Sequence, residues 1–264
     1  MSFHQELRVA ESIARQAGLH VLRERARHME VSIKAPNDLV TNVDRSSEQL
    51  ITAAIREHFP GDAILGEEYG VTPGEDASQN TGSRRWLIDP IDGTANFAMG
   101  IPLYCVSIAL QVDGQTVVGV IYEPNRDELF SARRGMPALL NGEPIDVSSC
   151  DRVANAVLVT GFPSGRGEVF ERAIEQFVHL TRSSRGVRRL GSAAIDLAYV
   201  ACGRIDAFWE YGLSPWDTGA GYLLVECAGG KITDIEGAPY HVDGPSILAS
   251  NGALHHELQN ALRV

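Results

Sequence analysis

The chain of 264 residues has few cysteines and no long apolar run. Its four cysteines are widely spaced and form no C-x-x-C pair, which argues against a zinc site or a disulfide framework. We therefore expect reduced, buried thiols at Cys105, Cys150, Cys202 and Cys227. The N-terminal segment lacks the uninterrupted apolar core of a signal peptide, and no later run approaches membrane-spanning length. These absences predict a cytoplasmic protein with no membrane contact.

Basic residues are scarce relative to acidic ones, with 23 Lys and Arg against 34 Asp and Glu and a formal net charge of -11. This balance disfavours a broad nucleic-acid surface, which needs a concentrated positive face. A small anionic substrate would need cations supplied locally. The basic residues cluster at Arg182, Arg185, Arg188 and Arg189. This cluster could reach a bisphosphate or an RNA segment, but a solvated connection between a helix and a strand is the simpler interpretation.

Composition is that of an ordinary folded protein, because hydrophobic residues make up 44% of the chain and charged residues 22%. The length allows one large domain or two small ones. The chain contains neither an internal repeat nor a long Pro/Gly-rich linker. We therefore predict one domain over residues 1–264, with sub-regions of about 1–150 and 151–264.

Hydrophobic periodicity predicts an α/β fold built in layers. In the first sub-region, helices are expected over 4–28 and from Asp44 or the Ser46-Ser47 pair to Pro60-Gly61. A mostly antiparallel sheet should follow, with a hairpin turn at Asp113-Gly114 and an exposed, mobile loop over 71–84. Its strands are predicted over 63–65, 86–88, 103–112, 116–122 and 129–131. The second sub-region alternates strands over 156–160, 187–190 and 206–209 with helices over 169–181, 193–201 and 218–227.

Acidic residues recur at predicted strand ends and sharp turns. They are Asp44, Glu67, Glu68, Asp89, Asp92 and Asp217. Taken singly, Asp44 and Asp217 are explained as caps of the helices that follow them. The segment Asp-Pro-Ile-Asp-Gly-Thr over 89–94 changes this interpretation, because it follows an apolar strand and carries two carboxylates around a stiffening proline.

Convergence of Glu67, Asp89, Asp92 and Asp217 would place four carboxylates in one site, where their repulsion requires bound cations. Oxygen ligands unaccompanied by Cys or His favour Mg²⁺ or Mn²⁺ over zinc. Gly93-Thr94 opens a predicted helix, and its free backbone amides suit a phosphate group. Metal ions beside a phosphate site predict phosphoryl chemistry.

These residues carry a resemblance to the inositol monophosphatase family, which covers nearly the whole chain in order. The matching stretches are residues 38–44, 66–68, 86–97, 189–194, 206–210 and 216–221. The resemblance implies an αβαβα sandwich and a Mg²⁺-dependent, lithium-sensitive phosphatase that forms a homodimer. Lys34 stands ten residues before Asp44, one residue nearer than the corresponding family lysine.

Carried onto this sequence, the resemblance implies two to three Mg²⁺ ions, with Mn²⁺ as a possible substitute. Glu67, Asp89 and the carbonyl of Ile91 would hold one ion, and Asp89, Asp92 and Asp217 a second. A third, more weakly bound ion would be held by Glu67 and by water molecules. Glu67 and Thr94, the latter backed by Asp44, would orient a water for direct attack without a phosphoenzyme. Substrate would contact Asp92, Gly93, Thr94, Gly191, Ser192, Ala193 and Glu210.

In the family, the residue matching Glu210 accepts hydrogen bonds from polyol ring hydroxyls. Without the resemblance, an exposed carboxylate at a strand end would be preferred for Glu210. Inositol monophosphate is thus the leading substrate. Fructose-1,6-bisphosphatase, histidinol phosphatase and nucleotide 3'-phosphatase activities remain alternatives, as does, from another class, a binding partner of the transcription machinery.

Two further motifs have plain structural interpretations. Neighbouring His255 and His256 point in different directions on a helix and have no carboxylate motif around them, so we expect surface histidines. The segment Gly-Phe-Pro-Ser-Gly over 161–165 has the wrong serine spacing for a nucleophile elbow. It is predicted to be a loop at a strand end.

Overall fold

The structure, a computed structural model, describes residues 3–25, 27, 29–35, 38–75 and 84–263. Most of the loop expected over 71–84 therefore lies outside the described residues. Its ends do not: residues 71 and 72 belong to strand β4 (Gly70–Thr72), and Arg84 opens β5 (Arg84–Asp92). Within the described ranges, no helix combines the length and apolar character needed to cross a membrane.

Two long helices form the first layer. Helix α1 (His4–Arg25) buries the predicted apolar stripe, and α2 (Asn42–His58) lies beside it. The hairpin β1 (Val31–Ala35) and β2 (Asp38–Thr41) connects them. The start predicted for α2 at Asp44 or Ser46 is wrong, because Thr41 is the N-cap and its Oγ1 accepts hydrogen bonds from the amides of Val43 and Asp44. Asp44 lies in the first turn, where its carboxylate accepts from the Thr41 amide and closes a capping box.

An eight-stranded sheet forms the second layer, in the order β10-β9-β8-β7-β6-β5-β3-β4. The strands besides β4 and β5 are β3 (Ala63–Gly66), β6 (Cys105–Val112), β7 (Gln115–Glu123), β8 (Glu128–Arg133), β9 (Leu139–Leu140) and β10 (Glu143–Pro144). The prediction of a mostly antiparallel sheet is confirmed, since β3–β5 is parallel and the other described pairs are antiparallel. Asp113 and Gly114 form the predicted turn with φ of 50° and 77°, values typical of a type I′ hairpin.

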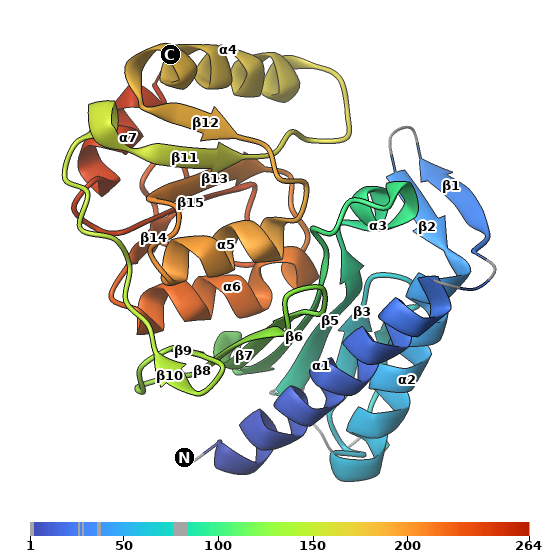
Figure 1. Cartoon of the computed structure of the whole chain (residues 1–264). Coiled ribbons are helices and arrows are strands. Elements are labelled where there is room, and N and C mark those ends of the chain that lie inside the picture. Colours follow the sequence, from blue (N-terminus) through green and yellow to red (C-terminus); the bar gives the residue numbers. More distant parts are fainter. Residues whose placement is uncertain (1–2, 26, 28, 36–37, 76–83, 264) are drawn as a thin grey trace.

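A five-stranded sheet carries the second half of the chain, in the order β12-β11-β13-β15-β14. Its strands are β11 (Val157–Thr160), β12 (Gly186–Arg188), β13 (Ala207–Tyr211), β14 (Lys231–Thr233) and β15 (Ser246–Ser250). A 3₁₀ turn (Val153–Asn155) precedes it, and α4 (Glu168–Ser183) and α7 (His255–Ala261) pack on its outer face (Figure 1). The predicted alternation holds as far as residue 227; β14, β15 and α7 were missed.

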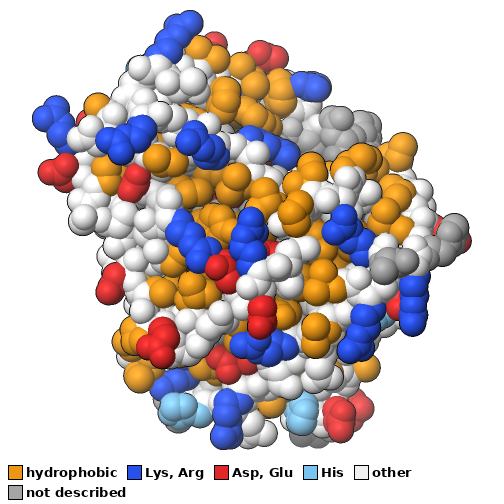
Figure 2. Space-filling view, viewed as in Figure 1, with side chains coloured by type: hydrophobic (Ala, Val, Ile, Leu, Met, Phe, Trp, Pro, Cys, Tyr) orange, Lys and Arg blue, Asp and Glu red, His pale blue; other side chains and the backbone are white. Residues whose placement is uncertain are grey.

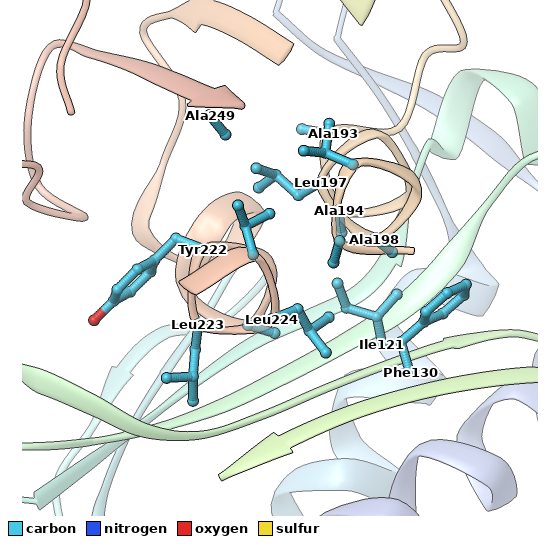
Figure 3. Close-up of a cluster of buried hydrophobic side chains, with 14 of the residues drawn as sticks. Ile121, Phe130, Ala193, Ala194, Leu197, Ala198, Tyr222, Leu223, Leu224 and Ala249 are labelled. Atoms are coloured by element: carbon cyan, nitrogen blue, oxygen red, sulfur yellow. The ribbon is translucent and has the colours of Figure 1, made fainter. Parts of the chain in front are cut away.

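Helices α5 (Ala193–Ala201) and α6 (Pro215–Cys227) lie between the two sheets, and this arrangement confirms the predicted layered sandwich (Figure 1). Figure 3 shows Leu197 of α5 and Leu224 of α6 in one cluster with Ile121 of β7 and Ala249 of β15. The two helices approach closely, because a Cβ on Gly221 would lie 2.6 Å from the side chain of Leu197. This contact joins the middle of α5 to the middle of α6. A core shared by both sheets supports our proposal of one domain.

Two predictions about single side chains need correction. The four cysteines are free, but only Cys105 among them is buried, and the other three are half-buried. His255 is not a surface residue: its Nδ1 lies 2.8 Å from Ser250 Oγ and its Nε2 lies 2.9 Å from Thr233 Oγ1. Burial, with the Lys231 charge, lowers the pKa of His255 to about 4. His256 is exposed as predicted.

Candidate active site

Strands β3 and β5 bring the first acidic residues together. They run parallel as neighbours, and the Glu67 amide donates to the Ile88 carbonyl at 3.2 Å. Glu67 therefore follows β3 at the level where Asp89 stands on β5, and the two carboxyl groups are within hydrogen-bonding reach. Pairing of β5 with β6 is irregular between Asp89 and Asp92, where Pro90 has no amide hydrogen to donate. Asp89 and Asp92 therefore stand on either side of an interruption in the β5–β6 hydrogen-bond ladder.

The segment that carries Glu67 is held from behind by Glu48 of α2. The Glu48 carboxylate accepts from the amides of Glu68 and Tyr69 at 2.7 and 3.1 Å. A Cβ on Gly66 would lie 1.9 Å from Glu48 Oε1, so glycine is required for this approach. In front, Lys34 Nζ lies 3.3 Å from Glu67 Oε1 and 2.5 Å from Glu68 Oε1. The β1–β2 hairpin thereby supplies a cation to the acidic turn.

Asp92 ties the two halves of the chain together at the site. Its Oδ2 accepts from Ser192 Oγ and from the Ala194 amide, both at 2.6 Å. Next to it, Gly93 has a φ of 95° and caps helix α3 (Thr94–Met99), as predicted. A Cβ on Gly93 would lie only 3.1 Å from the Gly191 carbonyl oxygen. The backbone of Gly93 therefore sits directly against the loop that opens α5.

Asp89, Asp92 and Asp217 each use one carboxylate oxygen for a structural hydrogen bond. The amide of Ile91 donates to Asp89 Oδ1 at 3.0 Å, and the amide of Ser214 donates to Asp217 Oδ2 at 2.7 Å. Asp92 uses Oδ2 in the same way. Asp217 stands in the first turn of α6 and closes a capping box with Ser214, so the capping explanation holds for it, and its place in a metal site stays a prediction. One oxygen fixes the orientation of each carboxylate, while the second oxygen is left for a ligand.

The electrostatics of these carboxyl groups show that they are crowded. Burial raises the pKa of Asp89, Asp92 and Asp217 above the ordinary range, and the neighbouring carboxylates add to the rise for Asp89 and Asp217. Burial also raises the pKa of Glu67 to about 7, against the opposing effect of Lys34. Such mutual repulsion disfavours full ionisation in the absence of a positive charge.

Thr94 and Asp44 stand side by side, as the sequence predicted. Thr94 Oγ1 lies 3.0 Å from Asp44 Oδ1 and 3.0 Å from the Ile91 carbonyl oxygen, so its one hydroxyl hydrogen can be donated to either. Asp44 is fully buried, and burial raises its pKa even though hydrogen bonds from Thr41 and Thr94 oppose the rise. The carbonyl predicted to bind a metal is therefore also an acceptor for the threonine predicted to orient water.

No group of three His, Cys, Asp or Glu side chains in the described ranges is arranged as it stands to hold a metal ion. The donor chemistry nevertheless fits a hard divalent cation. Glu67, Asp89, Asp92 and Asp217 offer only oxygen, burial raises their pKa values, and each Asp keeps an oxygen outside its structural bond. Their assignment as metal ligands remains a prediction.

The opposite wall of the site carries Glu210, in the middle of β13. The alternative of an exposed carboxylate is wrong, because Glu210 is only 9% exposed. Its carboxylate lies over Gly161, where a Cβ would meet Glu210 Oε1 at 2.1 Å. Burial raises the pKa of Glu210 to about 8, while the Arg189 guanidinium opposes this rise. The segment over 161–165 is the loop at the end of β11 that was predicted.

A cavity of about 220 Å³ joins these walls. Its lining includes the predicted metal ligand Asp217 and all seven predicted substrate contacts, namely Asp92, Gly93, Thr94, Gly191, Ser192, Ala193 and Glu210. An adjoining cavity of about 260 Å³ is lined by Lys34, Glu67, Glu210 and Asp217. Glu67 and Asp217 are thus brought to one opening. Asp44, Asp89 and Ile91 stand behind the surface and are linked to it through Thr94 and Glu67.

The sequence analysis missed several residues that line the cavity of about 220 Å³. Phe162 and Leu213 give it apolar surface, and Arg189 was noticed only as part of a basic cluster. Asp196 was not singled out at all. A signal was present, because Asp196 is the charged residue within the otherwise apolar segment Ala-Ala-Ile-Asp-Leu-Ala-Tyr-Val-Ala of α5.

The basic cluster is a solvated surface, as the simpler interpretation predicted. Arg182, Arg185, Arg188 and Arg189 are all exposed. Figure 2 shows Lys and Arg side chains on this face separated by apolar and uncharged surface and by acidic side chains. They do not merge into the continuous positive surface that a nucleic-acid backbone requires.

Comparison with known proteins agrees with this site. The model of the inositol monophosphatase family matches residues 3–264. The chain is therefore a phosphatase by class. It belongs to the inositol monophosphatase family.

Similar proteins carry two kinds of name. An inositol-1-monophosphatase of Mesorhizobium japonicum is 42% identical over 260 residues, which are 97% of this chain and 96% of that protein. Nus factor SuhB of Escherichia coli K12 is 41% identical over 94% of this chain and 92% of its own length. Among solved structures, the extragenic suppressor protein suhB of Bartonella henselae is 38% identical with a TM-score of 0.92, covering 98% of both chains.

Proposed function

We propose that this chain hydrolyses myo-inositol monophosphate to inositol and phosphate by direct attack of water, with Mg²⁺ as cofactor. One observation carries the proposal. Carboxylates from β3, β5 and α6 meet at a cavity whose other wall bears a buried glutamate, Glu210. The first group suits metal-assisted phosphoryl chemistry, and the second suits the hydroxyls of the leaving alcohol.

Bound Mg²⁺ would supply the positive charge that the phosphate and the leaving oxygen require. The chain's own residues position the attacking water and the two ends of the substrate cavity. Asp44 holds the Thr94 hydroxyl at 3.0 Å, where Thr94 can orient an attacking water. Asp92 and the Gly93 backbone hold the loop over 191–194 against β5, so the phosphate end and the alcohol end of the cavity move as one unit. Mn²⁺ should substitute for Mg²⁺, because it accepts the same oxygen ligands.

Selectivity for a polyol rests on Glu210, supported by the loop of Gly191, Ser192 and Ala193. The related fructose-1,6-bisphosphatase, histidinol phosphatase and nucleotide 3'-phosphatase activities share the phosphate end and differ at this wall. Relatives named Nus factor SuhB leave a transcription-linked role open by name alone. The separated basic side chains do not favour that role.

The proposal includes four finer properties that the family resemblance implies. They are a count of two to three metal ions, inhibition by lithium, a homodimer and a cytoplasmic location. Lithium should take the second metal position, which Asp89, Asp92 and Asp217 would hold, after hydrolysis.

A phosphate-release screen with and without Mg²⁺ tests the function directly. The substrates are inositol monophosphate, fructose-1,6-bisphosphate, histidinol phosphate and adenosine 3',5'-bisphosphate. We expect the highest kcat/KM on inositol monophosphate and no release without a divalent ion. A higher kcat/KM on any of the other three would replace the proposed substrate, and release in the presence of a chelator would refute the metal requirement.

A further inference from the structure

One carboxyl group in the cavity has no hydrogen-bond partner. Asp196 is 1% exposed, and its Oδ1 is one of three buried side-chain atoms of the described residues that lack a partner. The other two atoms, Gln176 Oε1 and Trp209 Nε1, belong to residues around the core of β13, α4 and α7. Buried polar groups are almost always paired, so this carboxyl group needs an explanation.

The position of Asp196 supplies that explanation. It stands in the first turn of α5, two residues after Ala194, whose amide binds Asp92. It lines the cavity of about 220 Å³ together with Glu210 of β13 and Arg189. Burial raises the pKa of Asp196 well above its ordinary range, the neighbouring Glu210 and Asp92 add to this rise, and the Arg189 guanidinium opposes it. Asp196 therefore stands at the boundary between the substrate cavity and the packed interior.

The chemistry of this wall selects a kind of ligand. A carboxyl oxygen accepts hydrogen bonds in either protonation state, and a guanidinium only donates them. A fully ionised second phosphate has no hydrogen to donate to the carboxyl oxygens of Glu210 and Asp196, whereas an alcohol with several hydroxyls can donate to both and accept from Arg189. Each hydroxyl supplies one donor and two acceptor positions, which matches the mixed demand of this wall.

We propose that Asp196 is a second hydroxyl-recognition residue, which accepts a hydrogen bond from a ring hydroxyl of the leaving polyol other than the one bound by Glu210. This inference rests on the proposed function and deepens it. If Asp196 and Glu210 each accept a hydrogen bond from a different hydroxyl, the enzyme distinguishes a polyol monophosphate from a simple alcohol phosphate more strongly than it would with Glu210 alone.

The test compares wild type with Asp196→Asn on inositol monophosphate and on 4-nitrophenyl phosphate, whose leaving group lacks ring hydroxyls. We expect kcat/KM to fall at least tenfold more on the inositol substrate. Glu171→Gln, in the exposed first turn of α4, is the matched control and should show equal ratios on both substrates. Equal losses on the two substrates for Asp196→Asn would overturn the inference.

Deoxyinositol monophosphates, each lacking one hydroxyl, locate the contact. Wild type should prefer inositol monophosphate to each deoxy substrate that lacks a recognised hydroxyl. Asp196→Asn should largely lose this preference for one deoxy substrate, and Glu210→Gln should lose it for a different one. Preferences that survive in Asp196→Asn for every deoxy substrate would refute a direct contact. The melting temperature of Asp196→Asn without ligand tests for a purely structural role. A lower melting temperature together with equal losses of kcat/KM on both substrates would also overturn the inference.

The wild-type measurements separate the two proposals. Wild type that cleaves 4-nitrophenyl phosphate but not inositol monophosphate would refute the proposed substrate and, with it, the role of Asp196. Wild type that prefers inositol monophosphate while Asp196→Asn keeps that preference would refute the role of Asp196 alone. The smaller variant Asp196→Ser repeats the comparison if the asparagine variant does not fold.

Discussion

Replacement of Gly161 by alanine offers a test of Glu210 that leaves Glu210 itself unchanged. The new Cβ would lie 2.1 and 2.2 Å from the two carboxylate oxygens of Glu210, so the carboxylate must move away. These atoms form the end of a flexible side chain, and Gly161 does not have a positive φ. The free energy of unfolding should therefore change by less than about 1 kcal/mol.

The size of the kinetic effect depends on pH. With a pKa of about 8, Glu210 is mostly protonated at pH 7 and mostly ionised at pH 9. A hydrogen bond to a neutral group contributes about 0.5–1.5 kcal/mol and one to a charged group about 1.5–3 kcal/mol. Loss of the contact should thus lower kcat/KM on inositol monophosphate roughly 2- to 10-fold at pH 7 and roughly 10- to 150-fold at pH 9.

The assay measures kcat/KM on inositol monophosphate and on 4-nitrophenyl phosphate at both pH values. Gly165→Ala is the matched control, because a Cβ there meets no atom within 4 Å. In a Glu210→Gln background, Gly161→Ala should add little, since both changes remove one contact. A loss that is equal on the two substrates, or additive in the double variant, would contradict the assignment of Glu210 to substrate recognition.

Further predictions concern the acidic end of the site and the fold. Asp92→Asn and Asp217→Asn should each lower kcat at least about 100-fold on both substrates at saturating Mg²⁺, since every substrate uses the same metal ions; near-normal turnover would remove the residue from the metal site. Millimolar Mg²⁺ or Mn²⁺ should raise the melting temperature of wild type more than that of either variant, and an unchanged wild-type curve would argue against the site. The folded chain holds His255 with a pKa of about 4 against 6.5 for an ordinary histidine, so it binds that proton less tightly than the unfolded chain. About 3 kcal/mol of unfolding free energy, present above about pH 6.5, should therefore be lost as the pH falls to about 4. Urea titrations at several pH values should show this loss of unfolding free energy in wild type and a smaller loss in His255→Gln. An equal loss between pH 6.5 and pH 4 in both proteins would refute the assignment.

The sequence determined the elements whose signals are local. The apolar stripe of α1, the strand before Asp89 and the turn at Asp113-Gly114 were predicted close to their observed positions, because periodicity and turn chemistry depend on neighbouring residues. The acidic residues, their motif order and the family could be identified for the same reason. The region after residue 227 was missed, because β14, β15 and α7 are short and carry weak periodic signals.

Tertiary structure alone decided which single polar side chains are buried and what they face. His255 and Glu210 each sit in a short segment whose pattern also fits an exposed side chain, and their burial follows from the surfaces that pack over them. Asp196 faces a cavity only because α5 is clamped between two sheets and its first turn is tied to Asp92. Contacts between residues about 100 positions apart, such as Ser192 with Asp92, leave no trace in local periodicity, since each partner is chosen by packing across layers.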